Sequence, residues 1–325
     1  MSSDSAEPIN SDILIIGSGP AGWTAAIYGA RAMRSTRIVT GLQPGGQLTI
    51  TTEVENYPGY AEIQGPELME KMKAHALTMG ANLAEDHIIS VDLNSRPFNA
   101  TGDSGTIYSG KTIIIATGAQ ARWLGLASEE KFQGFGVSAC ATCDGFFYRG
   151  KEVIVVGGGN TAVEEALFLC SFAKKVTLIH RRDSLRAEKI LQHRLFNHPK
   201  IEVVWNSEVE EVLGDENPRN VTGALIRNQI TGEARTIATH GIFIAIGHAP
   251  STDLFKGKLD MTPNGYLIVE PGSTTTHIPG VYAAGDVTDE KYRQAITAAG
   301  LGCMAALDAV NFLDESEDNI TEFGI

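Results

Sequence analysis

The chain has 325 residues, 43% of them hydrophobic, and carries a formal net charge of −13. This length suits two domains of roughly 100–200 residues each, and the acidic balance argues against nucleic acid as the main partner, because phosphate binding requires a basic surface. Residues 1–10 lack the apolar core of a secretory signal, and no uninterrupted apolar run approaches the roughly 18 residues of a membrane span. We therefore expect a soluble, cytoplasmic protein that binds neither nucleic acid nor a membrane.

The first pattern in the chain is a strand, a glycine-rich loop and a helix. Residues 13–16 form an apolar, β-branched run, which is typical of a strand buried on both faces of a parallel sheet. The loop 17–22 follows, then a helix-forming stretch over 23–33 and a second strand over 37–40. This order predicts a βαβ unit.

The same order recurs at an offset of 140 residues. The strand 153–156 leads into the loop 157–162, a helical stretch to about residue 172 and the strand 176–179. In such loops the first glycine permits the tight turn, the second lets a pyrophosphate approach the backbone, and the third position lets helix and strand pack closely. Two of these loops in matching positions predict two dinucleotide sites.

The residues after each second strand indicate which nucleotide binds. The second repeat ends in His180, Arg181 and Arg182, with Arg186 close behind, and guanidinium groups suit the 2′-phosphate of NADPH. A solvated basic turn is the alternative interpretation. The first repeat ends in Thr40 and Gly41 without an acidic residue, which leaves its ligand open between FAD and NAD.

Two cysteines, Cys140 and Cys143, form a C-x-x-C motif between the repeats. A zinc site needs four ligands, and no second motif supplies them, so a redox-active dithiol is the favoured interpretation, ahead of inert cysteines. We expect the two thiols to lie at a helix start, where the helix dipole lowers the pKa of the thiol. The adjacent Asp144 is a candidate general acid for a departing thiolate, or else a helix cap. Cys170 and Cys303 stand alone in apolar, helix-like runs, and we expect both to pack in the core.

Taken together, these motifs resemble the low-molecular-weight, bacterial-type thioredoxin reductases, a class of the pyridine nucleotide-disulfide oxidoreductases, over about residues 12–314. The matching stretches are 17–22, 45–49, 53–59, 116–119, 138–147, 157–165, 180–183, 284–287 and 292–295.

The resemblance implies an α/β fold of two Rossmann-like dinucleotide-binding domains, each with three layers and a parallel central sheet, the second inserted into the first. The FAD-binding domain would be discontinuous, 1–118 and 249–325, and the NADPH-binding domain 119–248 would carry the C-x-x-C motif. Members of this family are homodimers. The inserted domain is also expected to turn about the junctions near Gly118 and Gly247 during turnover.

The resemblance further implies hydride transfer from NADPH to FAD, reduction of the Cys140–Cys143 disulfide, and dithiol exchange with thioredoxin. Cys143 would face the flavin, Cys140 would attack thioredoxin, and Asp144 would act as general acid. The FAD-binding residues are expected to be Gly17, Ser18, Gly19, Pro20, Ala21, Gly22, Thr40, Gly41, Gly45, Gly46, Gln47, Leu48, Asn56, Ile88, Ala116, Thr117, Gly118, Cys143, Gly285, Asp286, Arg293, Gln294 and Ala295. The NADPH-binding residues are expected to be Gly157, Gly158, Gly159, Asn160, Thr161, His180, Arg181, Arg182, Arg186, Ile246 and Gly247, with no metal.

Three other functions compete with this hypothesis. A peroxiredoxin reductase of the same superfamily would typically carry additional N-terminal thioredoxin-like domains. A flavin-dependent ferredoxin or oxygen reductase would not need the C-x-x-C motif. A redox sensor would bind both nucleotides without turning over a protein disulfide.

Overall fold

The computed structural model describes residues 7–50 and 54–322, so Glu53, in one of the family-like stretches, lies outside the described residues. The chain divides into two compact units, one of Met1–Gln120 with Ala249–Ile325 and one of Ala121–His248. Each unit is built around its own sheet.

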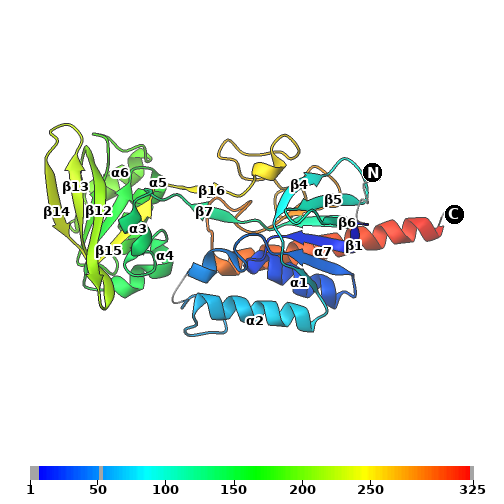
Figure 1. The fold of residues 1–325 in the computed structure, drawn as a ribbon. Helices are drawn as coiled ribbons and strands as arrows, with labels where there is room; N and C mark the ends of the chain where they lie inside the picture. Colours follow the sequence, from blue (N-terminus) through cyan, green and yellow to red (C-terminus); the bar gives the residue numbers. More distant parts are fainter. Residues whose placement is uncertain (1–6, 51–53, 323–325) are drawn as a thin grey trace, which may run out of the picture. The chain divides into compact units, whose positions relative to one another are not determined.

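The sheet of the first unit has seven strands in the order β3-β2-β1-β6-β5-β4, with β17 also paired to β6 (Figure 1). Its centre is parallel, whereas β4 and β5 form an antiparallel meander with β6. The strands are β1 (Ile9–Ile16), β2 (Thr36–Val39), β3 (Asn82–Ala84), β4 (Ile88–Asp92), β5 (Phe98–Gly102), β6 (Ile107–Ile115) and β17 (Val281–Ala283).

Alternation along β1 separates two cores in this unit. Ile13 and Ile15 pack against the helices α1 (Pro20–Arg31), α2 (Gly65–Thr78) and α7 (Ala295–Glu322). Leu14 and Ile16 face the meander and a segment that contains the short 3-10 helix η3 (Asp253–Phe255). Another 3-10 helix, η1 (Gly46–Ile50), precedes α2. The sheet is therefore the middle of three layers.

Helix α7 is long and apolar enough to cross a membrane by length and composition, over Ala295–Glu317 with a mean hydropathy of 1.5. Its small side chains Ala305, Ala306 and Ala309 are fully buried in the core against α1. A core helix of a soluble protein meets the same criteria, so this feature is weak evidence for a membrane span.

The second unit contains a five-stranded, wholly parallel sheet in the order β11-β10-β9-β15-β8. Its strands are β8 (Val137–Ser138), β9 (Glu152–Gly157), β10 (Lys175–Ile179), β11 (Ile201–Val204) and β15 (Gly241–Ala245). One face is covered by α4 (Ala141–Asp144), α5 (Asn160–Leu169) and α6 (Lys189–Phe196), and the short helix α3 (Ala127–Lys131) precedes β8.

The other face of this sheet is covered by three antiparallel strands, β12 (Ser207–Glu216), β13 (Arg219–Asn228) and β14 (Ala234–Ala238). Val209, Val212 and Val221 pack from this layer onto Ile154 and Val156 of β9. The expected fold class, two Rossmann-like three-layer units with parallel central sheets, is confirmed. The antiparallel layer β12–β14 of the second unit is an addition to it.

The two connections between the units pair with each other as a two-stranded sheet, β7 (Ala119–Ala121) with β16 (His248–Pro250). Gly118 precedes β7 with φ of 70°, and Gly247 precedes β16 with φ of 106°. Both angles lie in the left-handed region, which favours glycine. Each connection is therefore preceded by a residue whose backbone conformation only glycine adopts without strain.

Candidate functional site

The first glycine loop joins β1 to α1. A side chain at Gly17 would overlap the carbonyl oxygen of Ala116, and one at Gly22 would overlap that of Gly17, so both close approaches require glycine. Gly19 is the N-cap of α1, and no atom lies within 4 Å of the position that its Cβ would occupy. This open space at the positive end of a 12-residue helix fits the pyrophosphate of a dinucleotide.

Ser18 connects this loop to the segment after β2. Its hydroxyl donates a hydrogen bond to the carbonyl of Thr40 at 2.8 Å and accepts one from the backbone N–H of Gly45 at 3.0 Å. A Cβ at Gly46 would lie 3.6 Å from the Cα of Gly19. The structure thus brings together the loop 17–22 with Thr40, Gly45 and Gly46, which the sequence places far apart.

Asp286 follows β17 and is close to the start of α1, since a Cβ at the preceding Gly285 would lie 2.9 Å from the Cβ of Ala21. Burial, helped by the carboxylate of Asp289 and opposed by Arg293, raises the pKa of Asp286 to about 7. A half-buried carboxyl of this kind is a suitable hydrogen-bonding partner for the hydroxyl groups of a ligand.

Asp289, which the sequence analysis missed, organises the turn before α7. Its carboxylate accepts backbone hydrogen bonds from Lys291 (2.9 Å), Tyr292 (2.8 Å) and Arg293 (3.0 Å). Arg293 has φ of 49°, a strained value for a residue other than glycine. The sequence signal that could have revealed Asp289 is an Asp a few residues before an apolar helix-forming run, where its carboxylate can accept hydrogen bonds from nearby backbone N–H groups.

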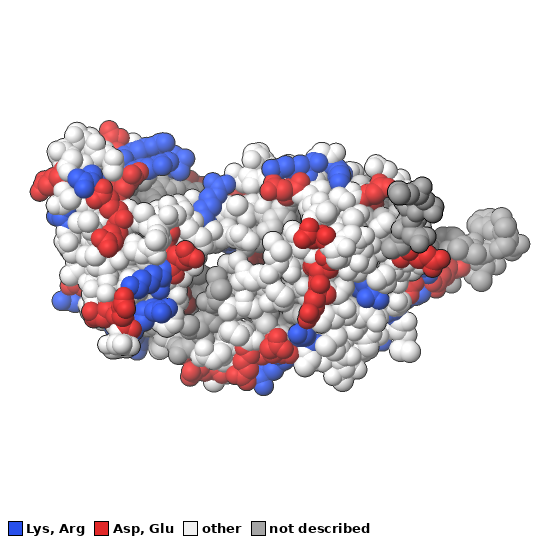
Figure 2. Space-filling model, in the orientation of Figure 1, with Lys and Arg blue, Asp and Glu red and all other residues white. Residues whose placement is uncertain are grey.

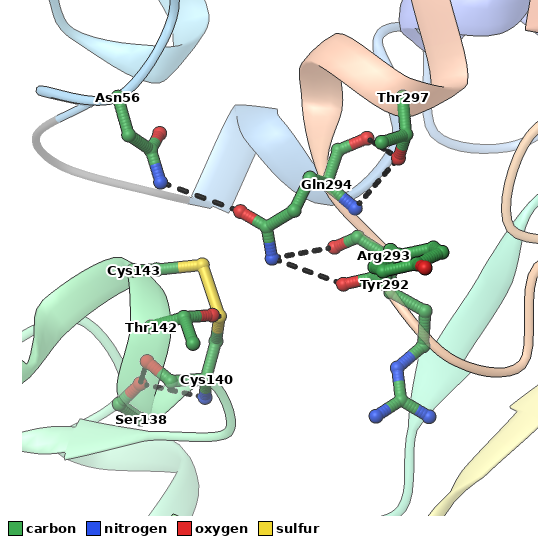
Figure 3. Close-up of a disulfide and its surroundings, with 9 residues drawn as sticks. All are labelled: Asn56, Ser138, Cys140, Thr142, Cys143, Tyr292, Arg293, Gln294 and Thr297. Atoms are coloured by element: carbon green, nitrogen blue, oxygen red, sulfur yellow. Dashed lines mark hydrogen bonds between the residues drawn. A yellow bond between two sulfur atoms is a disulfide. The ribbon is translucent and has the colours of Figure 1, made fainter. Parts of the chain in front are cut away.

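Gln294 and Asn56 meet in the same unit (Figure 3). Asn56 Nδ2 donates to Gln294 Oε1 at 3.3 Å, while Gln294 Nε2 donates to the carbonyls of Tyr292 and Arg293. Ile88, by contrast, is 2% exposed within the core.

The second glycine loop joins β9 to α5. Gly159 is the N-cap of this 10-residue helix, and no atom lies within 4 Å of the position of its Cβ. A side chain at Gly158 would overlap the imidazole ring of His180, so this ring packs directly on the loop backbone. Gly157 pairs with Ala245 of β15, which brings Ile246 and Gly247 to the same end of the sheet.

His180 is 5% exposed, and its Nε2 lies 3.1 Å from the carbonyl oxygen of Ser184. Burial lowers the pKa of His180, and the positive charges of Arg182 and Arg186 add to this effect. Arg181, Arg182 and Arg186 are exposed. The segment therefore has a neutral, buried imidazole at its base and exposed guanidinium groups suited to an anionic phosphate.

The C-x-x-C motif forms a disulfide between Cys140 and Cys143, with 5.3 Å between the two Cα atoms (Figure 3). Cys140 is the N-cap of α4, and its backbone N–H donates to the hydroxyl of Ser138 at 3.0 Å. Cys140 Sγ lies 3.3 Å from Thr142 Oγ1. Because α4 has only four residues, its dipole is smaller than the sequence analysis assumed, and the Thr142 hydroxyl is a more direct source of polar stabilisation for a Cys140 thiolate.

Asp144 is the last residue of α4 and precedes the 3-10 helix η2 (Gly145–Tyr148). Asp144 occupies the N-cap position of η2, but its side chain makes no capping hydrogen bond there, and the N-cap of α4 is Cys140. Burial, together with the negative charge of Asp144, raises the pKa of Tyr148.

The two remaining cysteines differ. Cys170 is buried, as expected, and burial raises the pKa of its thiol to about 11. Cys303 is only partly buried, which differs from the core packing expected for it. It stands on α7 next to Tyr28 of α1. Among the side chains that the structure describes, those of residues 7–49 and 54–317, no three of His, Cys, Asp or Glu gather in a way that could hold a metal.

Comparison with known proteins gives one consistent result. Residues 11–302 match the family described as pyridine nucleotide-disulphide oxidoreductase. The chain is 57% identical over 308 residues to thioredoxin reductase of Rickettsia conorii, covering 94% of this chain and 99% of the relative. It is 56% identical over 313 residues to thioredoxin reductase of Vibrio cholerae, covering 94% and 97%.

A solved structure agrees with these sequence matches. The crystal structure of thioredoxin reductase from Streptococcus pyogenes is similar with a TM-score of 0.90 at 42% identity, covering 95% of this chain and all of that one. The predicted family resemblance is confirmed. The chain therefore belongs to the pyridine nucleotide-disulphide oxidoreductases and, among them, to the bacterial-type thioredoxin reductases, as an oxidoreductase that binds a flavin and a pyridine nucleotide.

Proposed function

We propose that this chain uses NADPH to reduce the disulfide of a thioredoxin, with FAD at the first glycine loop and NADPH at the second. The observation that carries the proposal is the Cys140–Cys143 disulfide. It lies in the unit whose glycine loop is hydrogen-bonded, through Gly158 and Arg186, to the segment that carries Arg181, Arg182 and Arg186. FAD, when bound, supplies two-electron exchange between the nicotinamide and this disulfide.

The first unit is suited to FAD by its chain geometry. The open N-terminus of α1 at Gly19 would take the pyrophosphate, and Asp286 would accept hydrogen bonds from hydroxyl groups of the ligand. The missing acid at Thr40 and Gly41 does not distinguish FAD from NAD, so the proposal of FAD there follows from the family to which the chain belongs.

The proposed thiol–disulfide exchange balances in atoms and electrons. Two electrons convert the Cys140–Cys143 disulfide into two thiols or thiolates. The Cys140 thiolate attacks one sulfur of the thioredoxin disulfide and releases the other as a thiolate, for which Asp144 is the proposed proton donor. The Cys143 thiolate then attacks Cys140 Sγ, which reforms the disulfide and frees reduced thioredoxin.

NADPH oxidation by the purified protein, followed with and without a thioredoxin, tests the proposal. We expect oxidation that depends on the thioredoxin. Binding of both nucleotides without thioredoxin-dependent turnover would instead favour a redox sensor, and rapid turnover with oxygen or ferredoxin alone would favour the corresponding reductase.

The two cysteines can be separated by substitution. Cys140→Ser leaves the proposed flavin-facing thiol in place, and we expect a long-wavelength charge-transfer band that Cys143→Ser lacks. Replacing both Arg181 and Arg182 with Ala is expected to impair the use of NADPH far more than that of NADH, since each charge-assisted contact with the phosphate contributes about 1.5–3 kcal/mol. An equal loss with both nucleotides would contradict the phosphate assignment.

We further propose a cytoplasmic homodimer in which the unit 121–248 turns about its two connections during turnover. The left-handed Gly118 and Gly247 at these connections support this motion, because glycine absorbs backbone changes at low steric cost. The face shown in Figure 2 carries acidic and basic side chains interspersed, which suits a soluble protein. Sedimentation of the purified protein would test the dimer.

A further inference from the structure

The proposed NADPH site is made of two separate segments, and its selectivity depends on how these are held together. The glycine loop 157–161 would bind the pyrophosphate, whereas the 2′-phosphate would meet Arg181, Arg182 and Arg186. The arginines stand on the segment 181–188, which has no helix or strand of its own between β10 and α6. A segment of this kind needs tertiary contacts to fix the positions of its side chains.

Asn160 provides such a contact. It is the first residue of α5, and its Oδ1 accepts a hydrogen bond of 2.8 Å from the backbone N–H of Glu188, the residue immediately before α6. Its Nδ2 donates to Glu188 Oε1 at 3.4 Å. The orientation of the amide follows from these partners, because only its oxygen can accept from a backbone N–H.

One backbone hydrogen bond reinforces this link. The N–H of Arg186 donates to the carbonyl of Gly158 at 2.8 Å. On its other side the segment is tied to α6, since Gln192 Nε2 donates to the carbonyl of Ala187 at 2.7 Å. Asn160 thus belongs to the glycine loop, and its side chain binds the last residue of the arginine segment 181–188.

We propose that Asn160 is a positioning residue for cofactor selectivity: by binding Glu188 it fixes the arginine segment relative to the glycine loop, so that the guanidinium groups meet the 2′-phosphate. The inference rests on the proposed NADPH site. It gives Asn160 a role that does not depend on its own contact with the nucleotide.

The first test measures binding of 2′,5′-ADP and of 5′-AMP by calorimetry, because these ligands differ in the 2′-phosphate alone. In Asn160→Ala we expect 2′,5′-ADP to bind about tenfold more weakly, the equivalent of about 1.4 kcal/mol or one hydrogen bond, with little change for 5′-AMP. The ratio of kcat/KM for NADPH to that for NADH should fall by a similar factor. Asn197→Ala, the same change at the exposed end of α6, is the matched control and should leave both ligands unaffected.

A second test exchanges the two partners. Asn160→Asp keeps the acceptor for the Glu188 N–H but sets two carboxylates against each other, so 2′,5′-ADP should bind more weakly. Adding Glu188→Gln gives the new carboxylate an amide donor. In the Asn160→Asp background, Glu188→Gln should strengthen binding of 2′,5′-ADP by more than it does in the wild-type background. In the Asn160→Ala background, Glu188→Gln should give no such recovery.

The outcomes separate the inference from the function on which it rests. Wild-type protein that binds 2′,5′-ADP no more tightly than 5′-AMP would overturn the NADPH site itself. Wild-type selectivity that persists in Asn160→Ala, or an equal weakening of both ligands, would overturn the role of Asn160 while leaving the NADPH site intact.

Discussion

The raised pKa of Asp286 makes the stability of the flavin-free protein depend on pH. Its carboxyl has a pKa of about 7 in the folded chain against the ordinary aspartate value of 3.8, because burial and the charge of Asp289 disfavour its ionised form. The folded protein therefore binds this proton more tightly than the unfolded chain does. The perturbation that isolates the effect is Asp286→Asn, which keeps the size of the side chain and removes its titration.

The sign and size of the effect follow from linkage. The contribution of this proton to folding is complete below about pH 4, decreases as the pH rises, and is lost above about pH 7. A difference of about three pKa units corresponds to about 4 kcal/mol over the whole range, of which about 2 kcal/mol falls between pH 5.5 and pH 8. The Asn variant should therefore gain stability relative to wild type, by about 2 kcal/mol, over that interval.

Urea unfolding of flavin-free protein at pH 5.5 and pH 8, with wild type and variant side by side, measures this difference. His180 titrates with the opposite sign, since burial lowers its pKa, but it is present in both proteins and cancels. Asp253→Asn, at a side chain that is 89% exposed, is the control for the chemical change. A stability difference that is the same at both pH values would refute the reasoning.

Three other substitutions or labelling experiments test the local geometry. Gly158→Ala should lower the free energy of unfolding by about 1–3 kcal/mol, because its methyl group would overlap the buried His180 ring, whereas Gly159→Ala should be tolerated in the open space beside it; equal effects would contradict this geometry. In the Cys143→Ser background, Thr142→Val should raise the pKa of the Cys140 thiol, measured from the pH dependence of its alkylation rate. Thr142→Ser, which keeps the hydroxyl, should leave that pKa as it is with Thr142. Peptide mapping after iodoacetamide treatment of the native protein should find Cys303 labelled and Cys170 protected by burial; the reverse pattern would show that burial does not control their reactivity.

The features that the sequence predicted are those governed by local physics. A buried β-branched strand followed by closely spaced glycines leaves few alternatives to a strand-loop-helix turn, so both glycine loops could be located by residue. The disulfide was expected from the C-x-x-C spacing, because a helix start brings two thiols three residues apart within bonding distance, and the two Cα atoms lie 5.3 Å apart here. The family resemblance then extended these local patterns to the fold class.

The features that the sequence missed depend on what packs against a segment. The strands β12–β14 form a layer because their valines cover the outer face of β9, and nothing within their own residues specifies that partner. Helix α4 was expected to provide a useful dipole, yet it ends after four residues, where the chain tightens into η2. Cys303 lies in an apolar run, but on α7 it is only partly buried, and periodicity alone does not distinguish half-burial from burial.

The bridge between Asn160 and Glu188 shows why selectivity is harder to read from a sequence than binding. The charge of the arginines indicates a phosphate site, but charge alone does not fix the positions of their side chains. The residue that does so is neutral, lies 28 positions away from its partner, and belongs to a loop whose glycines already have an assigned purpose. Its contribution becomes visible only when the segments after β9 and β10 are brought side by side in the parallel sheet. Selectivity in this site is therefore expected to change with substitutions at neutral residues that carry no charge complementary to the phosphate, and Asn160→Ala is the direct test of that expectation.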